Sequence, residues 1–199
     1  MNDFHAELCH LGEVAEVAAG HPLRSAVDDL PTGDTGVIQM RNVDPETGID
    51  WLSVARVELP RARRIELLDS GDVIFSTRGA RTYAVALDEV PFRAVCSPHF
   101  FVLRIRGPAV VPEFLAWQIN QAPAQEYLRR EATGSRILNI RREVIERLEI
   151  VIPSRERQTA IVAFAEAAAR EKRLLVGLIE NRQQQINALA AGLRASDED

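Results

Sequence analysis

Residues 161–194, IVAFAEAAAREKRLLVGLIENRQQQINALAAGLR, carry an apolar repeat whose spacing alternates between four and three residues. Lys172 and Arg182 are the two polar residues within this register. Such a repeat predicts one long helix that packs its apolar stripe against another helix, as in a coiled coil. A helix from residue 155 to residue 194 would be about 60 Å long at 1.5 Å per residue. The predicted coiled-coil positions are Ile161, Ala165, Ala168, Leu175, Ile179, Ile186, Leu189 and Leu193.

The residues before this helix have the size and composition of one folded domain. The chain has 199 residues, of which 46% are hydrophobic and 27% are charged, as is usual for soluble globular proteins. About 150 residues remain without the helix, which is enough for a single core. We therefore expect a globular domain over residues 1–153 and a helix for dimerisation and spacing over residues 154–199.

Helix and strand patterns are mixed in the globular part, without a regular βαβ alternation. This mixture predicts an α+β fold. Turn-forming residues predict a long loop over residues 20–36, and Pro123 predicts a break between helices. The expected strands are 37–40, 73–76, 83–87, 100–105 and 148–152, and the expected helices are 7–19, 112–119 and 141–147.

Positive charge in this chain comes almost entirely from arginine. Residues 1–50 hold 2 arginines and 10 acidic residues, a net charge of −8, whereas residues 51–157 hold 17 arginines and 13 acidic residues, a net charge of +4. Lys172 is the single lysine. The planar guanidinium of arginine suits phosphate oxygens and guanine edges, although a GC-rich genome would produce the same bias.

Targeting and cysteine patterns indicate a cytoplasmic protein that does not enter a membrane. No apolar stretch approaches the roughly 18 residues that span a bilayer. Residues 1–10 contain no lysine or arginine, so they do not have the basic start of a secretory signal. Cys9 and Cys96 lie far apart, without the spacing of a zinc site or a disulfide framework.

The common catalytic motifs are absent from the sequence. It has no GxxxxGK[ST] phosphate loop, GxSxG or HExxH motif. It also lacks the Pro-Pro pair of an amino-methyltransferase motif, and it lacks the acid two residues before a lysine that a PD…(D/E)xK nuclease core requires. The stretch Cys96-Ser97-Pro98-His99 is the one local cluster that resembles nucleophile chemistry. The acidic residues Asp28, Asp29 and Asp34 fit no metal-ligand spacing. We expect a binding protein that is not an enzyme and holds no metal or cofactor of its own.

Several motifs follow one another in a fixed order along the chain. They are Leu11-Gly12-Glu13-Val14-Ala15, Gly20 to Ser25, Val37 to Val43, Gly71 to Gly79, Gly134 to Ile140, Leu148 to Pro153, and Gln158 with Ile161. This order resembles the DNA-specificity (S) subunit of type I restriction–modification systems. Each repeat in that family is a target-recognition domain followed by a long helix. Family chains usually carry two repeats and this sequence has one, so the resemblance is to a half-size specificity subunit.

The resemblance implies a function in recognising DNA without catalysis. The globular domain would read a half-site in double-stranded DNA, and a homodimer would read a bipartite site. The helix would also contact the modification (methyltransferase) subunit, which binds S-adenosylmethionine and methylates adenine. A translocating nuclease subunit would be an optional further partner.

Polar side chains in the turn-rich segments are the candidate DNA contacts. Arginine and amide side chains can form paired hydrogen bonds with base edges. The preferred contact loop is 78–83, which follows a predicted strand and combines two arginines, a hydroxyl group and an aromatic ring. Arg61, Arg63 and Arg64 are expected at phosphates or on the solvated surface. The candidate DNA-binding residues are Arg24, Gln39, Arg41, Asn42, Arg78, Arg81, Thr82, Tyr83, Ser135 and Arg136.

Two other classes of protein remain possible from the sequence. One is a coiled-coil scaffold that assembles other proteins and never binds DNA. The other is a thiol enzyme that uses Cys96 and His99. A scaffold would show no salt-dependent DNA binding even with a methyltransferase present, whereas a thiol enzyme would lose its activity on Cys96→Ala.

Overall fold

The computed structural model describes residues 6–23, 27, 29–30, 32–59, 65–134 and 137–195, with side chains as far as residue 191. The chain divides into two compact units, residues 1–159 and residues 160–199. The first turn of the long C-terminal helix therefore belongs to the globular unit. Each unit is described below by itself.

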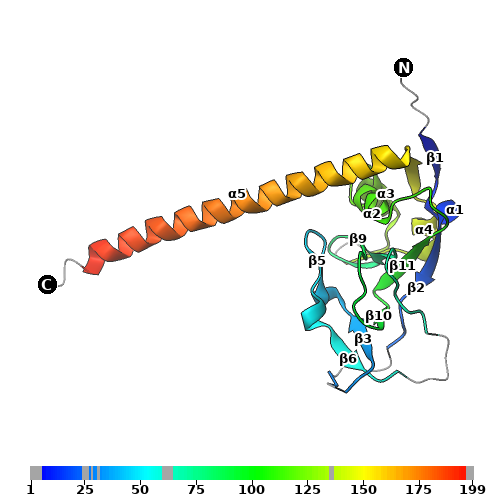
Figure 1. Ribbon diagram of the computed structural model, residues 1–199, viewed down its shortest axis with the longest axis horizontal. Helices are drawn as coiled ribbons and strands as arrows, with labels where there is room; N and C mark the ends of the chain where they lie inside the picture. Colours follow the sequence, from blue (N-terminus) through cyan, green and yellow to red (C-terminus); the bar gives the residue numbers. More distant parts are fainter. Residues whose placement is uncertain are drawn as a thin grey trace. The chain divides into compact units, whose positions relative to one another are not determined.

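A four-stranded antiparallel sheet forms the centre of the globular unit (Figure 1). Its two middle strands have the most apolar sequences, VIFS and FFVLRI. In the register, Phe101 lies opposite both Phe75 and Ala19. The strands, in their order across the sheet, are β2 (Ala15–Ala19), β11 (Phe100–Ile105), β7 (Val73–Ser76) and β9 (Ala84–Ala86).

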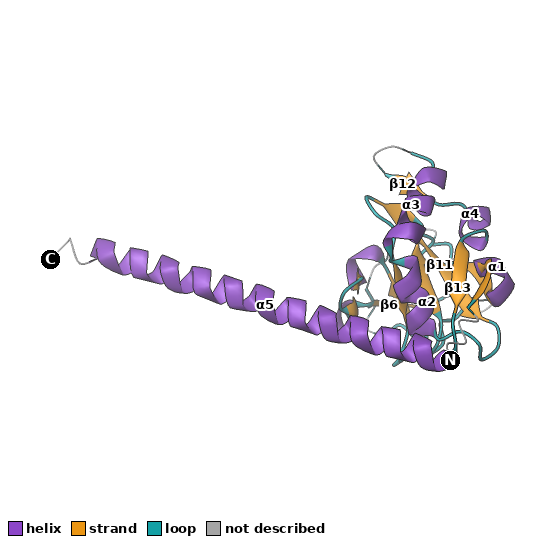
Figure 2. Ribbon diagram, turned by 90° about the horizontal axis from the view of Figure 1, so that it is seen from above, coloured by secondary structure: helices purple, strands orange, loops and turns teal. Residues whose placement is uncertain are grey.

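Both faces of this sheet are buried, which explains why its middle strands are apolar at successive positions. Val73 and Phe75 point into a core that the helices cover, and Ile74 points into a second core on the other face. Figure 2 shows these helices beside the sheet. They are α1 (Leu11–Val14), α2 (Pro112–Ile119), α3 (Ala122–Glu131) and α4 (Arg142–Glu146).

A three-stranded sheet contributes to the second core. Its middle strand β3 (Thr35–Ile38) pairs in parallel with β10 (Ala94–Cys96) and antiparallel with β6 (Ala55–Val57). Ile38 and Cys96 pack there with Phe100. Because β3 and β10 are parallel, the loops that follow them leave from the same end of the sheet.

Short paired strands and single turns complete the globular unit. Strand β1 pairs antiparallel with the last strand, β13, and brings the two ends of the globular sequence together. The remaining elements are β1 (Glu7–His10), β13 (Glu149–Ile152), β4 (Val43–Asp44), β5 (Gly48–Ile49), β8 (Arg78–Gly79), β12 (Leu138–Asn139) and the 3-10 turns η1 (Met40–Asn42) and η2 (Trp51–Ser53).

The α+β class expected from the sequence is confirmed, and so are several individual elements. Strands 73–76 and 100–105 have the expected bounds, and α2 begins at Pro112 as expected. Helix α3 begins at Ala122, with Pro123 in its first turn. Proline suits this position because the first N–H groups of a helix lack partners within the helix.

The helix expected over residues 7–19 is wrong. This segment is strand β1, the single turn α1 and strand β2. Its apolar residues fit a helical spacing, yet burial alternates along β2, where Ala15 and Val17 are buried and Glu16 is exposed. Residues 7–10 pair with β13 and residues 15–19 pair with β11, so tertiary contacts outweigh local propensity.

The C-terminal helix α5 (Arg155–Ala195) has 41 residues. It confirms the long helix that the apolar repeat predicts. Apolar side chains on the predicted stripe are exposed, including Leu175 at 54%, Ile179 at 68% and Leu189 at 72%. Within the ranges that the structure describes, no helix, α5 included, combines the length and apolar character needed to cross a membrane.

Gln158 anchors the first turn of α5 within the globular unit. Its side chain is fully buried. Nε2 donates to the carbonyl oxygens of Ala109 and Pro153 at 2.8 Å each, and Oε1 accepts from the N–H of Val111 at 2.8 Å. The side-chain amide of Gln158 thus satisfies three backbone groups, two from residues 109–111 and one from Pro153.

A buried carboxylate, Asp72, lies at the start of β7. It accepts the N–H of Asp69 at 2.9 Å, and one of its oxygens lies 3.4 Å from Nε of Arg104, which also pairs with Glu66. Burial raises the pKa of Asp72 to about 6, and the nearby charge of Asp69 adds to this effect. Asp72 therefore holds its proton more tightly in the folded state than in the unfolded chain.

This raised pKa predicts a pH dependence of stability. The contribution of Asp72 to the free energy of unfolding is fully present below about pH 4 and is lost as the pH rises through about 6. The loss amounts to about 3 kcal/mol at 1.36 kcal/mol per pKa unit. Urea unfolding of the wild type and Asp72→Asn between pH 4 and 7 should show the variant gaining stability relative to the wild type by roughly this amount. A difference that stays constant over this range would contradict the prediction.

Candidate nucleic-acid interface

Three loops that follow strands β3, β7 and β10 meet at one end of the globular unit. They are residues 39–44, 77–83 and 97–99, which we call the loop face. Because β3 and β10 pair in parallel, the first and third loops begin at the same end of their sheet. Hydrogen bonds then tie the second loop to both.

Thr77 joins the second loop to the third. Its N–H and its hydroxyl group both donate to the carbonyl oxygen of His99, at 2.8 and 3.0 Å. The carbonyl oxygen of Thr77 accepts the N–H of Ile140 at 2.8 Å. The N–H of Ser97 donates to the carbonyl oxygen of Ile38 at 2.8 Å. The turn 97–99 is therefore fixed against both β3 and the second loop.

Tyr83 joins the second loop to the first. Its ring is buried, and its hydroxyl group lies 3.7 Å from the sulfur of Met40. Burial raises the pKa of this hydroxyl group. Beside it, the hydroxyl group of Thr82 donates to the side-chain oxygen of Gln125 at 3.1 Å. These contacts hold residues 82–83 inside the protein.

Asn42 stabilises the first loop through hydrogen bonds of its buried side chain. Its side-chain oxygen accepts the N–H of Gln39 at 2.8 Å, and its amide donates to the carbonyl oxygen and the hydroxyl group of Ser53 at 2.9 and 3.0 Å. Asn42 is buried. The turn between these two residues is thereby fixed, with Arg41 exposed on it.

Exposed cationic and polar side chains from all three loops share this face. Arg41, Arg78, Arg81 and His99 are exposed, and Gln39 is half-buried. In the described part of the chain, the side chains of Arg41, Arg78 and His99 make no hydrogen bond or ion pair. Free guanidinium and imidazole groups on neighbouring rigid turns can donate hydrogen bonds to base edges and phosphate oxygens.

One acidic residue lies among these cations. Asp44 accepts the N–H groups of Glu46 and Thr47, at 2.8 and 2.9 Å. The bond from Glu46 contributes most to lowering the pKa of Asp44, and the nearby charge of Arg81 lowers it further. Asp44 is therefore ionised at neutral pH and offsets part of the positive charge of Arg81.

The structure divides the ten candidate DNA contacts into three groups. Gln39, Arg41, Arg78 and Arg81 come together on the loop face. Asn42, Thr82 and Tyr83 were also expected to contact DNA, and in the structure they are buried, with their side chains bonded to other parts of the protein. The candidates Arg24, Ser135 and Arg136, together with Arg61, Arg63, Arg64, Asp28 and the side chain of Leu193, lie outside the described residues.

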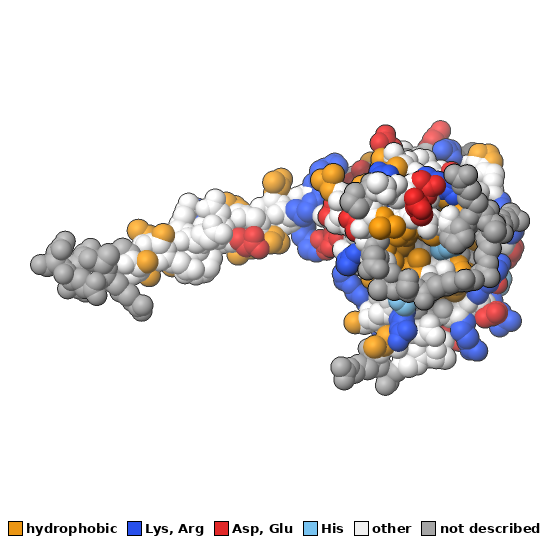
Figure 3. Space-filling model, turned by 90° about the horizontal axis from the view of Figure 1, so that it is seen from below, with side chains coloured by type: hydrophobic (Ala, Val, Ile, Leu, Met, Phe, Trp, Pro, Cys, Tyr) orange, Lys and Arg blue, Asp and Glu red, His pale blue; other side chains and the backbone are white. Residues whose placement is uncertain are grey.

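His99 and Asp44 belong to the loop face without having been candidate contacts. His99 reaches this place through a contact with Thr77, 22 residues earlier in the chain. No local pattern in the sequence signals such a contact. Figure 3 shows arginine and acidic side chains mixed over the globular unit on the face in view.

The geometry around Cys96 argues against the thiol-enzyme hypothesis. Cys96 is buried, and burial raises the pKa of its thiol to about 12. A thiol nucleophile requires a lowered pKa, because the thiolate is the reactive form. In the part of the chain that the structure describes, no group of three His, Cys, Asp or Glu residues could hold a metal ion.

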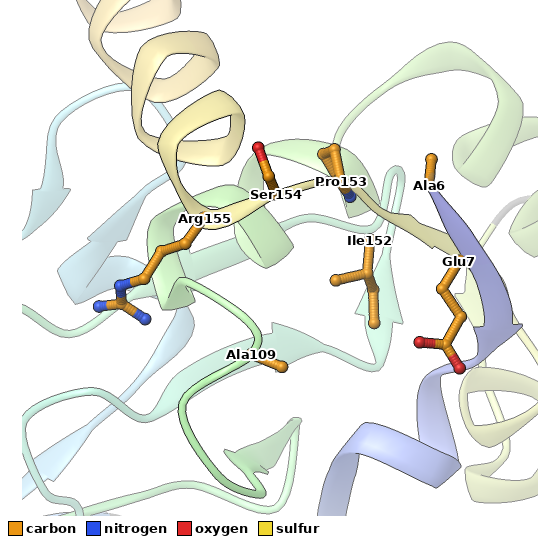
Figure 4. Close-up of a pocket in the computed structure, with 7 residues that line it drawn as sticks. All are labelled: Ala6, Glu7, Ala109, Ile152, Pro153, Ser154 and Arg155. Carbon is orange, nitrogen blue, oxygen red and sulfur yellow. The ribbon is translucent and has the colours of Figure 1, made fainter. Parts of the chain in front are cut away.

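A separate cavity of about 610 Å³ lies where β13 leads into α5 (Figure 4). The Arg155 guanidinium lies on the opposite side from the Glu7 carboxylate, and it donates to the carbonyl oxygen of Pro108 at 2.7 Å. Charged groups thus do not converge on this space, and we assign no ligand to it. Its lining residues are Ala6, Glu7, Ala109, Ile152, Pro153, Ser154 and Arg155.

Solved structures with the same fold include subunits of type I restriction–modification systems. The S subunit from M. genitalium is 18% identical with a TM-score of 0.60, over 92% of this chain and 44% of that one. The HsdS subunit from Thermoanaerobacter tengcongensis is 17% identical with a TM-score of 0.55, over 86% and 39%. A chain from a structure on complex assembly and conformational transition of the type I R-M system is 18% identical with a TM-score of 0.61, over 94% and 43%.

This chain therefore spans less than half the length of each of these proteins. A comparison with curated proteins gave no match. A family match, in contrast, covers residues 6–187, which includes the loop face and most of α5. The chain belongs to the family described as the type I restriction modification DNA specificity domain.

Proposed function

We propose that this protein is the sequence-reading component of a type I restriction–modification complex, and that its loop face reads a half-site in double-stranded DNA. The observation that carries the proposal is the convergence of Arg41, Arg78 and Arg81 on one rigid face of a member of this family. Arginines positioned in this way can form bidentate hydrogen bonds with guanine. Fixed loops spare the entropy of ordering the backbone that carries these side chains on binding.

Catalysis belongs, in this proposal, to the partner. The high pKa of the Cys96 thiol and the absence of methyltransferase and nucleotide-binding motifs from the sequence support a non-catalytic role. S-adenosylmethionine would bind the modification subunit. The acidic residues of the first fifty positions weaken the attraction to a polyanion, which favours a protein that grips DNA together with that subunit.

The exposed apolar stripe of α5 supports a homodimer. Leu175, Ile179, Ile186 and Leu189 are each more than half exposed, and such a stripe is stabilised by pairing with a second helix. A two-fold antiparallel pair would place two loop faces at a fixed separation and let them read a bipartite site. Centring this pair on Gly177 would set Lys172 opposite Arg182, so their stems must turn outward or the register must shift.

A second apolar stripe supports a further helical partner. Phe164, Leu174 and Leu178 lie beside the first stripe at helical spacing, and their exposed fractions are 77%, 75% and 59%. One pairing helix covers one stripe. We assign the second stripe to the modification subunit, which would then bind α5 beside the stripe that pairs with the second copy.

The arginines of the loop face provide the test of half-site reading. Arg78→Ala and Arg81→Ala should weaken binding of the methyltransferase complex to its own site about 5- to 150-fold more than to random duplex, since a bidentate base contact is worth about 1–3 kcal/mol. The site is first identified by mapping methylation in cells that hold both subunits, and affinities are then measured at one fixed salt concentration.

Arg93→Ala is the matched control for this test. Arg93 is exposed at the opposite end of β10 from the loop face, and its loss should leave the specificity ratio unchanged. Equal weakening on all sequences would reduce Arg78 and Arg81 to phosphate contacts. Absence of salt-dependent DNA binding in the complex would favour the alternative, a coiled-coil scaffold that does not bind DNA.

A further inference from the structure

A cavity of about 470 Å³ is lined by residues 39–41 and 97–99 of the loop face together with Leu23 and Val27. Leu23, Val27, Met40 and Pro98 give it apolar walls, and Gln39, Ser97 and His99 are the polar residues of the same lining. A small number of polar groups among apolar walls is the usual composition of a site for a planar organic ligand. Its volume exceeds that of a single heteroaromatic ring.

Ser97 gives this cavity an unusual feature. Its side-chain oxygen is buried and makes no hydrogen bond to the described part of the protein. Buried hydroxyl groups in proteins almost always have a partner. The backbone holds Ser97 in place on both sides, because its N–H donates to Ile38, and because Gly20 packs so closely that a Cβ there would lie 2.1 Å from the carbonyl oxygen of Ser97.

The depth of Ser97 restricts which ligand can use it. Exposed side chains such as Arg78 reach into a groove and read bases that remain stacked. The hydroxyl group of a residue that is only 3% exposed cannot reach outward in this way. A partner for it must enter the cavity, and a base of the proposed DNA ligand can do so only by leaving the duplex.

We propose that this cavity receives one nucleobase rotated out of the half-site duplex, with Ser97 and His99 as residues that determine its identity. The proposal rests on the proposed function and deepens it. The flat faces of the base would pack against Met40 and Pro98. Its polar edge would meet the hydroxyl group of Ser97, the imidazole of His99 and the amide of Gln39, which together offer both donors and acceptors.

Arg41 completes the arrangement at the rim. It is exposed, lines the same cavity and makes no hydrogen bond or ion pair with the described residues. A base can leave its stack only if the backbone on either side of it bends. A guanidinium beside the opening can hold the phosphate of the displaced nucleotide and stabilise the bent form.

The test uses duplexes in which unpairing has already occurred. The purified chain, without the methyltransferase, is first used to select a half-site from random duplexes at low salt. The methyltransferase is left out because such enzymes extrude bases themselves. Each position of the selected half-site is then replaced, one at a time, by a mismatch or by an abasic site in the opposite strand, and the affinity is measured.

We expect one position at which a mismatch strengthens binding about tenfold, because the cost of breaking that base pair no longer has to be met on binding. 2-Aminopurine at that position should become strongly more fluorescent on binding. Ser97→Ala and His99→Ala should lose most of the tenfold gain, whereas Ser70→Ala, at an exposed serine in a turn before β7, should keep it.

The outcomes separate this proposal from the proposed function. Sequence-specific binding in which every mismatch is neutral or weakening would overturn base insertion and leave half-site reading intact. Failure of the purified chain to select any duplex would overturn base insertion by this chain, whereas half-site reading is decided separately by the Arg78 and Arg81 variants of the methyltransferase complex. Free deoxynucleosides at millimolar concentration form the remaining arm: binding of these, together with no mismatch gain, would overturn base insertion by identifying the cavity as a small-molecule site.

Discussion

Aspartate at both Leu175 and Ile179 is expected to convert the protein from a dimer to a monomer. In the proposed two-fold pair, each substitution occurs twice, so four carboxylates would enter an apolar contact. Burial of unpaired charge costs several kcal/mol, which predicts at least a 100-fold weaker dimer. Light scattering at tens of micromolar should give twice 22.2 kDa for the wild type and 22.2 kDa for the double variant.

A matched double variant separates loss of the stripe from added negative charge. Gln184→Asp with Asn187→Asp adds two carboxylates on the side of α5 away from the apolar stripe, where both residues are exposed. This variant should remain dimeric. A wild type that is monomeric at tens of micromolar, or a Leu175→Asp, Ile179→Asp variant that remains a dimer, would contradict the homodimer.

Gln158→Leu is expected to produce the largest loss of stability of any single substitution in the first turn of α5. Leucine has nearly the same volume but leaves the Val111 N–H and the carbonyl oxygens of Ala109 and Pro153 without their present partner. An unsatisfied buried polar group costs about 1–3 kcal/mol. With allowance for non-additivity, we expect the free energy of unfolding to fall by about 3 kcal/mol or more.

Denaturant unfolding measures this change, and hydrogen exchange locates it. The amide of Val111 should exchange faster in Gln158→Leu than in the wild type, because its acceptor is lost. Gln184→Met, a comparable change at an exposed position of α5, should alter stability by no more than about 0.5 kcal/mol. A loss below 1 kcal/mol in Gln158→Leu would show that other groups replace these hydrogen bonds.

The elements that could be predicted from the sequence are those whose environment is uniform along their length. Strands 73–76 and 100–105 are apolar at every position except Ser76 and Arg104, because both faces of their sheet are buried. The long helix shows its period over many turns. Residues 7–19 lack this uniformity, since a single helical turn separates two strands whose partners lie far along the chain.

The candidate interface was predictable by residue type and only partly by position. Gln39, Arg41, Arg78 and Arg81 were expected at DNA from their chemistry, and the fold brings them together. Asn42 belongs to the same chemical class, yet its amide is used to hold its own loop. Whether a polar side chain serves the ligand or the scaffold depends on neighbours that folding supplies.

The contacts of Thr77 and Tyr83 have a consequence for how target specificity can change over time. These residues couple the three loops through His99 and Met40, so a substitution in one loop changes the positions of the side chains in the other two. Changes in recognition should therefore be epistatic, with the effect of one base-reading residue depending on those already present. A new target would then be acquired by exchanging the loops together with their shared contacts, as one inherited block.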